Sequence, residues 1–142
     1  MGIFITTASF SLQQNSVIEW CNQTVVEMAR SLLKSMGVLA IFWGEALRTA
    51  VHILNRAPTR SLNGKTRYEA WYRRKPSVYY FRVFGCVVHV KKVSPSVTKL
   101  SDKAIPMVFL RYEEGSKAYR VYDSKARKLH ITRDIVFQED KQ

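Results

Sequence analysis

Cysteine and histidine side chains are the first candidates for chemistry in this chain, because thiolates and imidazoles are the usual zinc ligands. Cys21 and Cys86 lie 65 positions apart, and His52, His89 and His130 are equally scattered. Zinc ligands usually come in pairs separated by about two to five residues, a spacing that no two of these residues show. We therefore expect no zinc site, and we expect both cysteines to be buried free thiols.

Lysine and arginine side chains are the second candidates, because they outnumber acidic residues by 23 to 11 and give a net charge of +12. Residues 1–57 hold four basic and three acidic residues, whereas residues 58–142 hold nineteen basic and eight acidic ones, a net charge of +11. Such an excess indicates a polyanionic partner, usually nucleic acid. The candidate contacts, several of them close to tyrosines, are Arg73, Arg74, Lys75, Lys91, Lys92, Lys117, Arg120, Arg127 and Lys128. The alternative is a solvated basic surface whose tyrosines pack inside the fold.

Two amphipathic helices are expected in the near-neutral front. Apolar residues recur at spacings of three and four at Val17, Cys21, Val25, Met28, Leu32 and Met36. This stripe predicts a helix over residues 16–36, opened by a capping box of Ser16 and Glu19 and ended by Gly37. A second helix is predicted over residues 41–56, with a buried face at Phe42, Ala46, Thr49, Ala50, Ile53 and Leu54.

The basic rear begins with a short helix and continues in strands. Thr66 and Glu69 predict a second capping box, which opens a helix through about Tyr72. Short β-prone runs then follow at 81–92, 107–112, 118–123, 128–132 and 134–137, with a bend at Gly85. Strands this short and closely spaced predict a small closed or half-open barrel. A further β-prone run at residues 3–7 precedes the first helix.

Nothing in the chain indicates a membrane or an export pathway. No run of 18 apolar residues occurs, and the first residues lack the basic and apolar regions of a secretory signal. We therefore expect an intracellular protein, nuclear or cytoplasmic, that is neither secreted nor embedded in a membrane.

The run Gln-Gln-Asn-Ser-Val-Ile-Glu at residues 13–19 resembles the final helix of copia-type retrotransposon integrases. The resemblance continues through ordered blocks at residues 42–46, 54–59, 63–77, 82–86, 99–103 and 119–123. From about Val78 onward the chain resembles the retroviral-polymerase SH3-like domain that follows the integrase core in such Pol polyproteins. The resemblance implies an α+β chain with three parts: a remnant of the ribonuclease-H-like integrase core at 1–57, a basic helical linker at 58–77 and an SH3-like β-barrel at 78–138.

The resemblance also assigns a catalytic ancestry to Glu19. Integrases of this family hold divalent ions, Mg²⁺ in the parent enzymes, with two aspartates on upstream strands and a glutamate on this helix. Glu19 matches that glutamate, and the two aspartates have no counterpart here, so the metal set is incomplete and no cofactor is expected for the chain as it stands. From the residues alone, Glu19 has the simpler interpretation of a capping-box residue near a helix N-terminus.

Several positions depart from the family pattern. Arg111 and Ala118 stand where the barrel usually has glycine, and Ser16 and Leu12 replace a glycine and a proline. These departures indicate a degenerate sequence. The sheet that the two helices would cover in a full core is also missing, so we expect the front to be the less stable half. It should exchange its amide hydrogens quickly, or hide its apolar stripes by self-association through helices 16–36 and 41–56 or against a partner.

The sequence therefore predicts an integrase-derived fragment that binds DNA or another nucleic acid without sequence preference and does not catalyse integration on its own. Two alternatives stay open. The chain is a segment of a longer polyprotein in which Glu19 serves a working integrase, or it is a non-functional or protein-interaction remnant.

Overall fold

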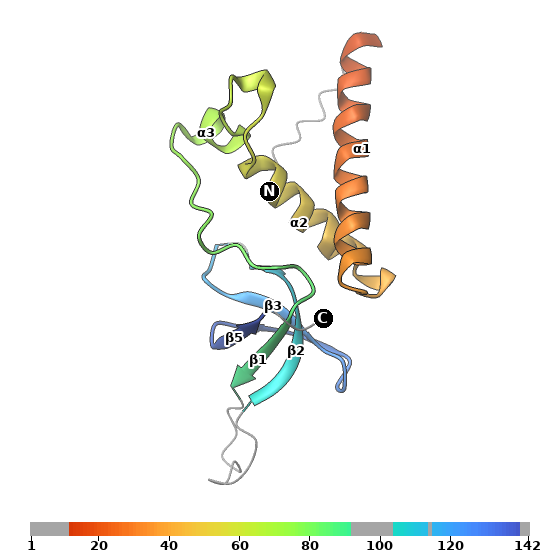
Figure 1. Ribbon diagram of the computed structural model, residues 1–142, viewed down its shortest axis with the longest axis vertical. Helices are drawn as coiled ribbons and strands as arrows, with labels where there is room; N and C mark the ends of the chain where they lie inside the picture. The colour runs from red at the N-terminus through yellow and green to blue at the C-terminus, as the bar shows by residue number, and fades with distance from the viewer. Residues whose placement is uncertain (1–11, 92–103, 114, 140–142) are drawn as a thin grey trace.

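A computed structural model describes residues 12–91, 104–113 and 115–139, without the side chains of residues 12–15 and 17. Helices lie above a curved sheet, and the connecting segment after α3 runs down from one to the other (Figure 1). The elements in chain order are α1 (Leu12–Ser35), η1 (Ala40–Phe42), α2 (Trp43–Arg56), η2 (Arg60–Leu62), α3 (Arg67–Tyr72), β1 (Val87–Lys91), β2 (Ala104–Tyr112), β3 (Tyr119–Asp123), β4 (Lys128–Thr132) and β5 (Ile135–Gln138). The β-prone run at 3–7 lies outside the described residues. No helix in the described part is long and apolar enough to cross a bilayer.

Helix α1 confirms the predicted amphipathic helix but not its start. It begins at Leu12, so Ser16 lies in its second turn. The expected capping box of Ser16 and Glu19 is therefore wrong, because an N-cap residue must precede the first helical turn. The buried side chains of α1 are Val25, Ala29 and Leu33. Val25 belongs to the predicted stripe, whereas Ala29 and Leu33 each follow a stripe residue, Met28 and Leu32, that is only partly buried.

Helices α2 and α3 follow the predictions closely. Phe42 of η1 and Ala46, Thr49 and Ala50 of α2 are buried as expected. Ile53 and Leu54, also predicted on the buried face, are only half-buried. At the start of α3, the Thr66 hydroxyl accepts a hydrogen bond from the Glu69 N–H at 3.0 Å, and the Glu69 carboxylate accepts one from the Thr66 N–H at 2.9 Å. These two bonds complete the predicted capping box.

The five strands form one antiparallel sheet in the order β4-β3-β2-β1-β5. A two-residue connection, Arg133 and Asp134, joins β4 at one edge to β5 at the other. Flat strands would put these edges about 19 Å apart, at about 4.8 Å per neighbouring pair, whereas three peptide units reach about 11 Å. The sheet must therefore curl into a half-barrel.

The expected closed barrel is not observed, and the half-open form is. In the part of the chain that the structure describes, β4 pairs with β3 and β5 pairs with β1, with no ladder between β4 and β5. The connection leads β4 into β5 end to end and does not form a side-by-side hairpin.

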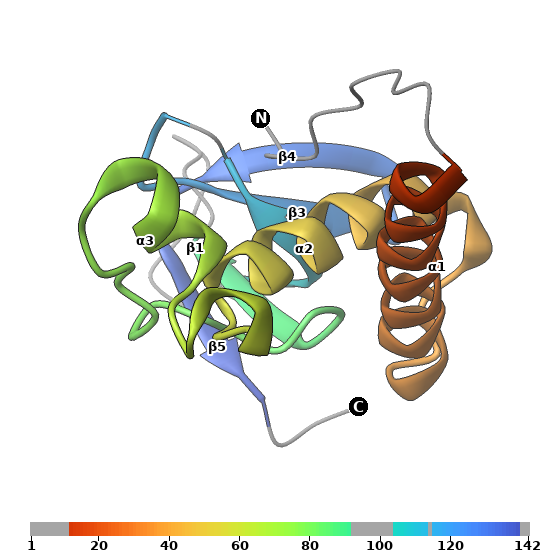
Figure 2. The same ribbon diagram turned by 90° about the horizontal axis from the view of Figure 1, so that it is seen from above.

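Two apolar clusters fill the fold. One lies in the curl of the sheet and consists of Cys86, Val88, Met107, Phe109 and Val121. The other joins the helices to the sheet and consists of Val25, Ala29, Leu33, Phe42, Ala46, Ala50, Phe84 and Leu110. The expectation that the helices lack a surface to cover is therefore wrong, because α2 packs across β2 of the same chain (Figure 2).

A β-bulge in β2 makes this packing specific. The register with β3 shifts between Phe109 and Arg111, so Leu110 is an extra residue on that strand. Without the shift, Leu110 and Arg111 would point to opposite faces of the sheet. With it, Leu110 joins the helix–sheet cluster and Arg111 contacts Glu45 of α2, while Tyr112 returns to the inner face.

Candidate nucleic-acid interface

The candidate cations fall into two groups, one on the segment after α3 and the loop between β2 and β3, the other at the far end of the sheet. Arg73, Arg74 and Lys75 follow α3 and lead to residues 80–82, where the Tyr112 hydroxyl donates to the Tyr80 carbonyl and accepts from the Arg82 N–H. Lys117 lies in the loop between β2 and β3 at this same end. All four cationic side chains are exposed.

The second group lies at the far end of the sheet. Lys91 ends β1, opposite Ala104 at the start of β2. Arg127 lies in the turn before β4, and Lys128 is the first residue of β4. These three side chains are exposed too. Lys92 lies outside the described residues. The candidate cations therefore do not form one continuous patch.

Arg120 differs from the other candidates. Its guanidinium lies 3.4 Å from the Glu45 carboxylate and 3.5 Å from that of Glu113, and its side chain is 23% exposed. The Arg111 side chain is 8% exposed, and its Nε lies 2.5 Å from Oε2 of the same Glu45. The two atoms form an ion pair, but their geometry is not that of a hydrogen bond. Arg120 thus belongs to a network of ion pairs that joins α2 to the sheet. Because its charge is already paired, it is a weaker candidate for phosphate contact.

The described acidic side chains of the rear are largely engaged within the fold. The Asp123 carboxylate accepts from the Lys125 and Ala126 N–H groups at 2.8 and 3.0 Å, and these bonds hold its pKa below the ordinary value. Glu139 accepts from the Val83 N–H at 3.2 Å. Among the described residues, Arg111 and Arg120 form ion pairs, and the exposed candidate cations form none with a described carboxylate.

Glu19 does not form part of a metal site in the described part of the chain. Its side chain is exposed on α1, and no group of three histidine, cysteine or carboxylate side chains there lies close enough to hold an ion. Mg²⁺ prefers an octahedral shell of oxygen ligands, and one exposed carboxylate does not supply a protein site for it. The residues described here do not fit the metal centre that the family resemblance implies.

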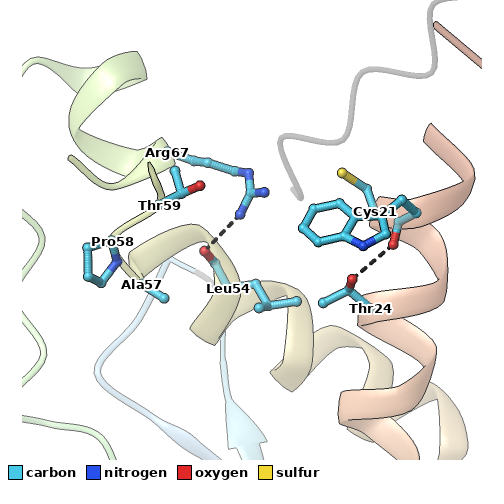
Figure 3. A pocket seen from close by; sticks show the side chains of 8 residues that line it. Cys21, Thr24, Leu54, Ala57, Pro58, Thr59 and Arg67 are labelled. Atoms are coloured by element: carbon cyan, nitrogen blue, oxygen red, sulfur yellow. Dashed lines mark hydrogen bonds between the residues drawn. The ribbon is translucent and has the colours of Figure 1, made fainter. Parts of the chain in front are cut away.

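A small hollow of about 150 Å³ lies near Glu19, between α1 and the segment after α2 (Figure 3). Trp20, Cys21 and Thr24 of α1 line one side, and Leu54 and Arg67 lie on the other. The Arg67 guanidinium donates to the Leu54 carbonyl at 3.3 Å, so this cation is used to hold α3 against α2. The hollow is therefore a packing gap and offers no set of catalytic groups.

The cysteines stay unpaired, as expected, although only Cys86 is buried and Cys21 is half-buried. Burial raises the pKa of the Cys86 thiol to about 11, which suits an inert core residue.

Sequence reasoning missed two cations near α3. Arg56 ends α2 and Lys65 follows the Asn63-Gly64 turn, and both line a second hollow together with Lys75. The Asn63-Gly64 turn could have indicated that Lys65 lies near α2. Asn63 and Gly64 have φ values of +53° and +78°, and the turn that they form folds the chain back toward that helix. That reversal brings together residues that are distant in sequence.

The sheet of this chain matches a known family. Residues 85–142 match the family model of the retroviral polymerase SH3-like domain. The match begins at Gly85, just before β1, and covers all five strands of the half-barrel.

Longer relatives extend the similarity across the helices. The chain is 36% identical over 127 residues, 89% of its length, to a retrovirus-related Pol polyprotein from transposon TNT 1-94 of Nicotiana tabacum. It is 27% identical over 136 residues, 96% of its length, to the corresponding polyprotein from transposon RE1 of Arabidopsis thaliana. It spans about a tenth of these polyproteins, at 10% and 9% of their lengths.

A shorter relative is an uncharacterised mitochondrial protein of Arabidopsis thaliana, 35% identical over 86 residues, or 58% of this chain and 72% of that protein. The chain belongs to the family of copia-type retrotransposon Pol polyproteins and is a segment that contains the SH3-like domain.

Proposed function

We propose that this segment is an integrase-derived nucleic-acid-binding module that contacts DNA through the phosphate backbone and with little sequence preference. The observation that carries the proposal is the set of exposed cations after α3 and at the ends of the half-barrel, which form no ion pair with a described carboxylate. Phosphate contacts give affinity without reading the base sequence, because every nucleotide carries the same charge. A family that inserts its own DNA would need such a module beside the catalytic core.

We propose no catalytic activity for the segment alone. Phosphoryl transfer assisted by two divalent ions requires several carboxylates in one place. Glu19 fits the role of a single ligand on an exposed helix face, and we propose that it serves catalysis only in a longer polyprotein that supplies the remaining carboxylates.

The salt dependence of DNA binding tests the proposed function. If the chain neutralises about four phosphates, affinity for a 20-base-pair duplex should fall roughly hundredfold between 50 and 200 mM salt, at a slope near −0.9 per contact. Fluorescence anisotropy with two duplexes of unrelated sequence gives both slopes. Affinity that is insensitive to salt, or that differs widely between the two sequences, would contradict binding through the phosphate backbone.

A further inference from the structure

The second hollow, of about 500 Å³ and open to solvent, lies beside α3. It is bounded by the turn at residues 63–66 and by the segment from Lys75 to Val78. Three cationic side chains line it, those of Arg56, Lys65 and Lys75, against one acidic side chain, that of Glu69. The lining therefore has a net charge of +2, in a space large enough for a nucleotide.

The acidic residue of this hollow already has a structural role. The Glu69 carboxylate accepts a hydrogen bond from the Thr66 N–H, and this bond holds the pKa of Glu69 below its ordinary value, with Lys75 and Lys65 adding to the effect. Both lysines line the hollow together with this carboxylate. Glu69 therefore closes the capping box of α3 beside the two lysines.

The backbone of the turn cannot serve as the anion site. The N–H groups of Asn63, Gly64 and Lys65 donate to the carbonyls of Arg60, Thr59 and Leu62, respectively, at 3.0 to 3.1 Å. The Thr66 N–H is taken by Glu69. An anion in the hollow must therefore be held by the cationic side chains. Lys65 and Lys75 are exposed, whereas Arg56 is half-buried and donates to the His52 carbonyl at 3.2 Å, so the two lysines are the free phosphate contacts.

Exposed aromatic rings adjoin these cations. Tyr79 is 84% exposed and follows Val78, which lines the hollow, and Tyr72 of α3 is 52% exposed. Tyr72 packs on Tyr68 at 4.6 Å between ring centroids, and the Arg56 guanidinium lies over Tyr68 at 4.9 Å. Cationic side chains interleaved with solvent-facing rings are typical of surfaces that bind unpaired nucleotides, because only unpaired bases can stack on a side chain.

We propose that this hollow binds a single-stranded nucleic-acid segment, with Lys65 and Lys75 on its phosphates and Tyr79 stacked on a base. The inference rests on the proposed nucleic-acid binding. It adds a particular site, the hollow beside α3, and a particular ligand, an unpaired strand. A strand end that is unpaired would be held here, while duplex DNA is held by the exposed cations elsewhere on the segment.

Binding of fluorescein-labelled (dT)₁₂ to the full chain tests the phosphate contacts. The double variant Lys65→Gln/Lys75→Gln should lose about tenfold in affinity at 50 mM salt and reduce the salt slope by about 1.4, from two contacts at about 0.7 each. The control is Arg30→Gln/Lys34→Gln, which removes the same charge from exposed positions on α1. An equal loss in both double variants would overturn the proposal.

The aromatic contact has its own matched pair of variants. Tyr79→Ala should weaken (dT)₁₂ binding at least fivefold, whereas Tyr79→Phe should leave it unchanged, because stacking needs the ring and not the hydroxyl. Unchanged binding by Tyr79→Ala would contradict the assignment. Thymidine monophosphate should compete far more weakly than the oligonucleotide, and equal competition at equal phosphate concentration would identify a free-nucleotide pocket instead.

Failure of this proposal can be told apart from failure of the proposed function. If wild-type protein binds duplex DNA with the expected salt slope but the hollow variants behave like their controls, only the single-strand subsite is wrong. If the wild-type protein binds neither duplex nor single strand at 50 mM salt, both are wrong.

Discussion

Replacing Glu45 with alanine should lower the free energy of unfolding by about 3 kcal/mol, the lower end of the cost of breaking a buried ion pair. Arg111 is 8% exposed and Glu45 is 16% exposed, so removal of the carboxylate leaves a guanidinium with little access to water. Arg120 loses a partner at 3.4 Å at the same time. Urea unfolding followed by circular dichroism measures the change.

A double variant separates this electrostatic cost from lost packing. Glu45→Leu combined with Arg111→Met replaces the pair with apolar side chains of similar size, an exchange that is often neutral or stabilising. We expect the double variant to recover most of the stability that Glu45→Ala loses. A double variant that is less stable than Glu45→Ala would show that the pair itself, and not the unpaired cation, determines stability.

Replacing Gly85 with alanine should cost about 3 kcal/mol, because two penalties add. Gly85 has a φ of +82°, where a side chain costs roughly 1–2 kcal/mol. A Cβ at this position would also lie 2.6 Å from Cγ2 of Val38 and 2.8 Å from Cβ of Met36, in the loop after α1. Overpacking of this kind costs roughly 1–3 kcal/mol.

Gly64→Ala is the matched control for this substitution. Gly64 has a similar φ of +78°, but no heavy atom lies within 4 Å of a Cβ built there. It should therefore lose only the backbone term, about 1–2 kcal/mol. Equal losses at the two positions, measured by thermal or urea unfolding, would contradict the close approach of the α1–α2 loop to the sheet.

Local elements were predictable from the sequence because their signals are local. The Thr66–Glu69 capping box and the buried residues of α2 depend on side chains within about one to two helical turns of one another. The bend at Gly85 depends on a single backbone angle. The start of α1 was misplaced because Ser16 and Glu19 have capping-box spacing, yet the helix continues for four residues before Ser16.

The joining of helices to sheet could not be predicted in the same way. It depends on an extra residue in β2, which turns Leu110 and Arg111 to one side and brings Arg111 to Glu45, 66 positions away. Alternation along a strand gives no sign of where a bulge will fall. Arg111 looked like a degenerate replacement of glycine, whereas it supplies an ion pair between α2 and β2.

The candidate interface was predicted in its charge but not in its arrangement. Net charge follows from composition, so an excess of cations after residue 57 was certain, and most candidates are exposed. The ion pair of Arg120 was not predictable because its carboxylate partner Glu45 lies on another element. Arg56 and Lys65 were missed because they meet Lys75 only through the turn before α3.

Lysine modification with and without DNA tests the central claim most directly, because lysines are concentrated in the rear. Lys34 is the one lysine in residues 1–57 of the sequence and serves as an internal reference. Reductive methylation followed by mass spectrometry should show that a 20-base-pair duplex protects several exposed lysines among Lys65, Lys75, Lys91, Lys117 and Lys128, while Lys34 reacts at its free rate. Protection of Lys34 alone, or of no lysine at DNA concentrations that saturate binding, would contradict a nucleic-acid interface in the basic rear.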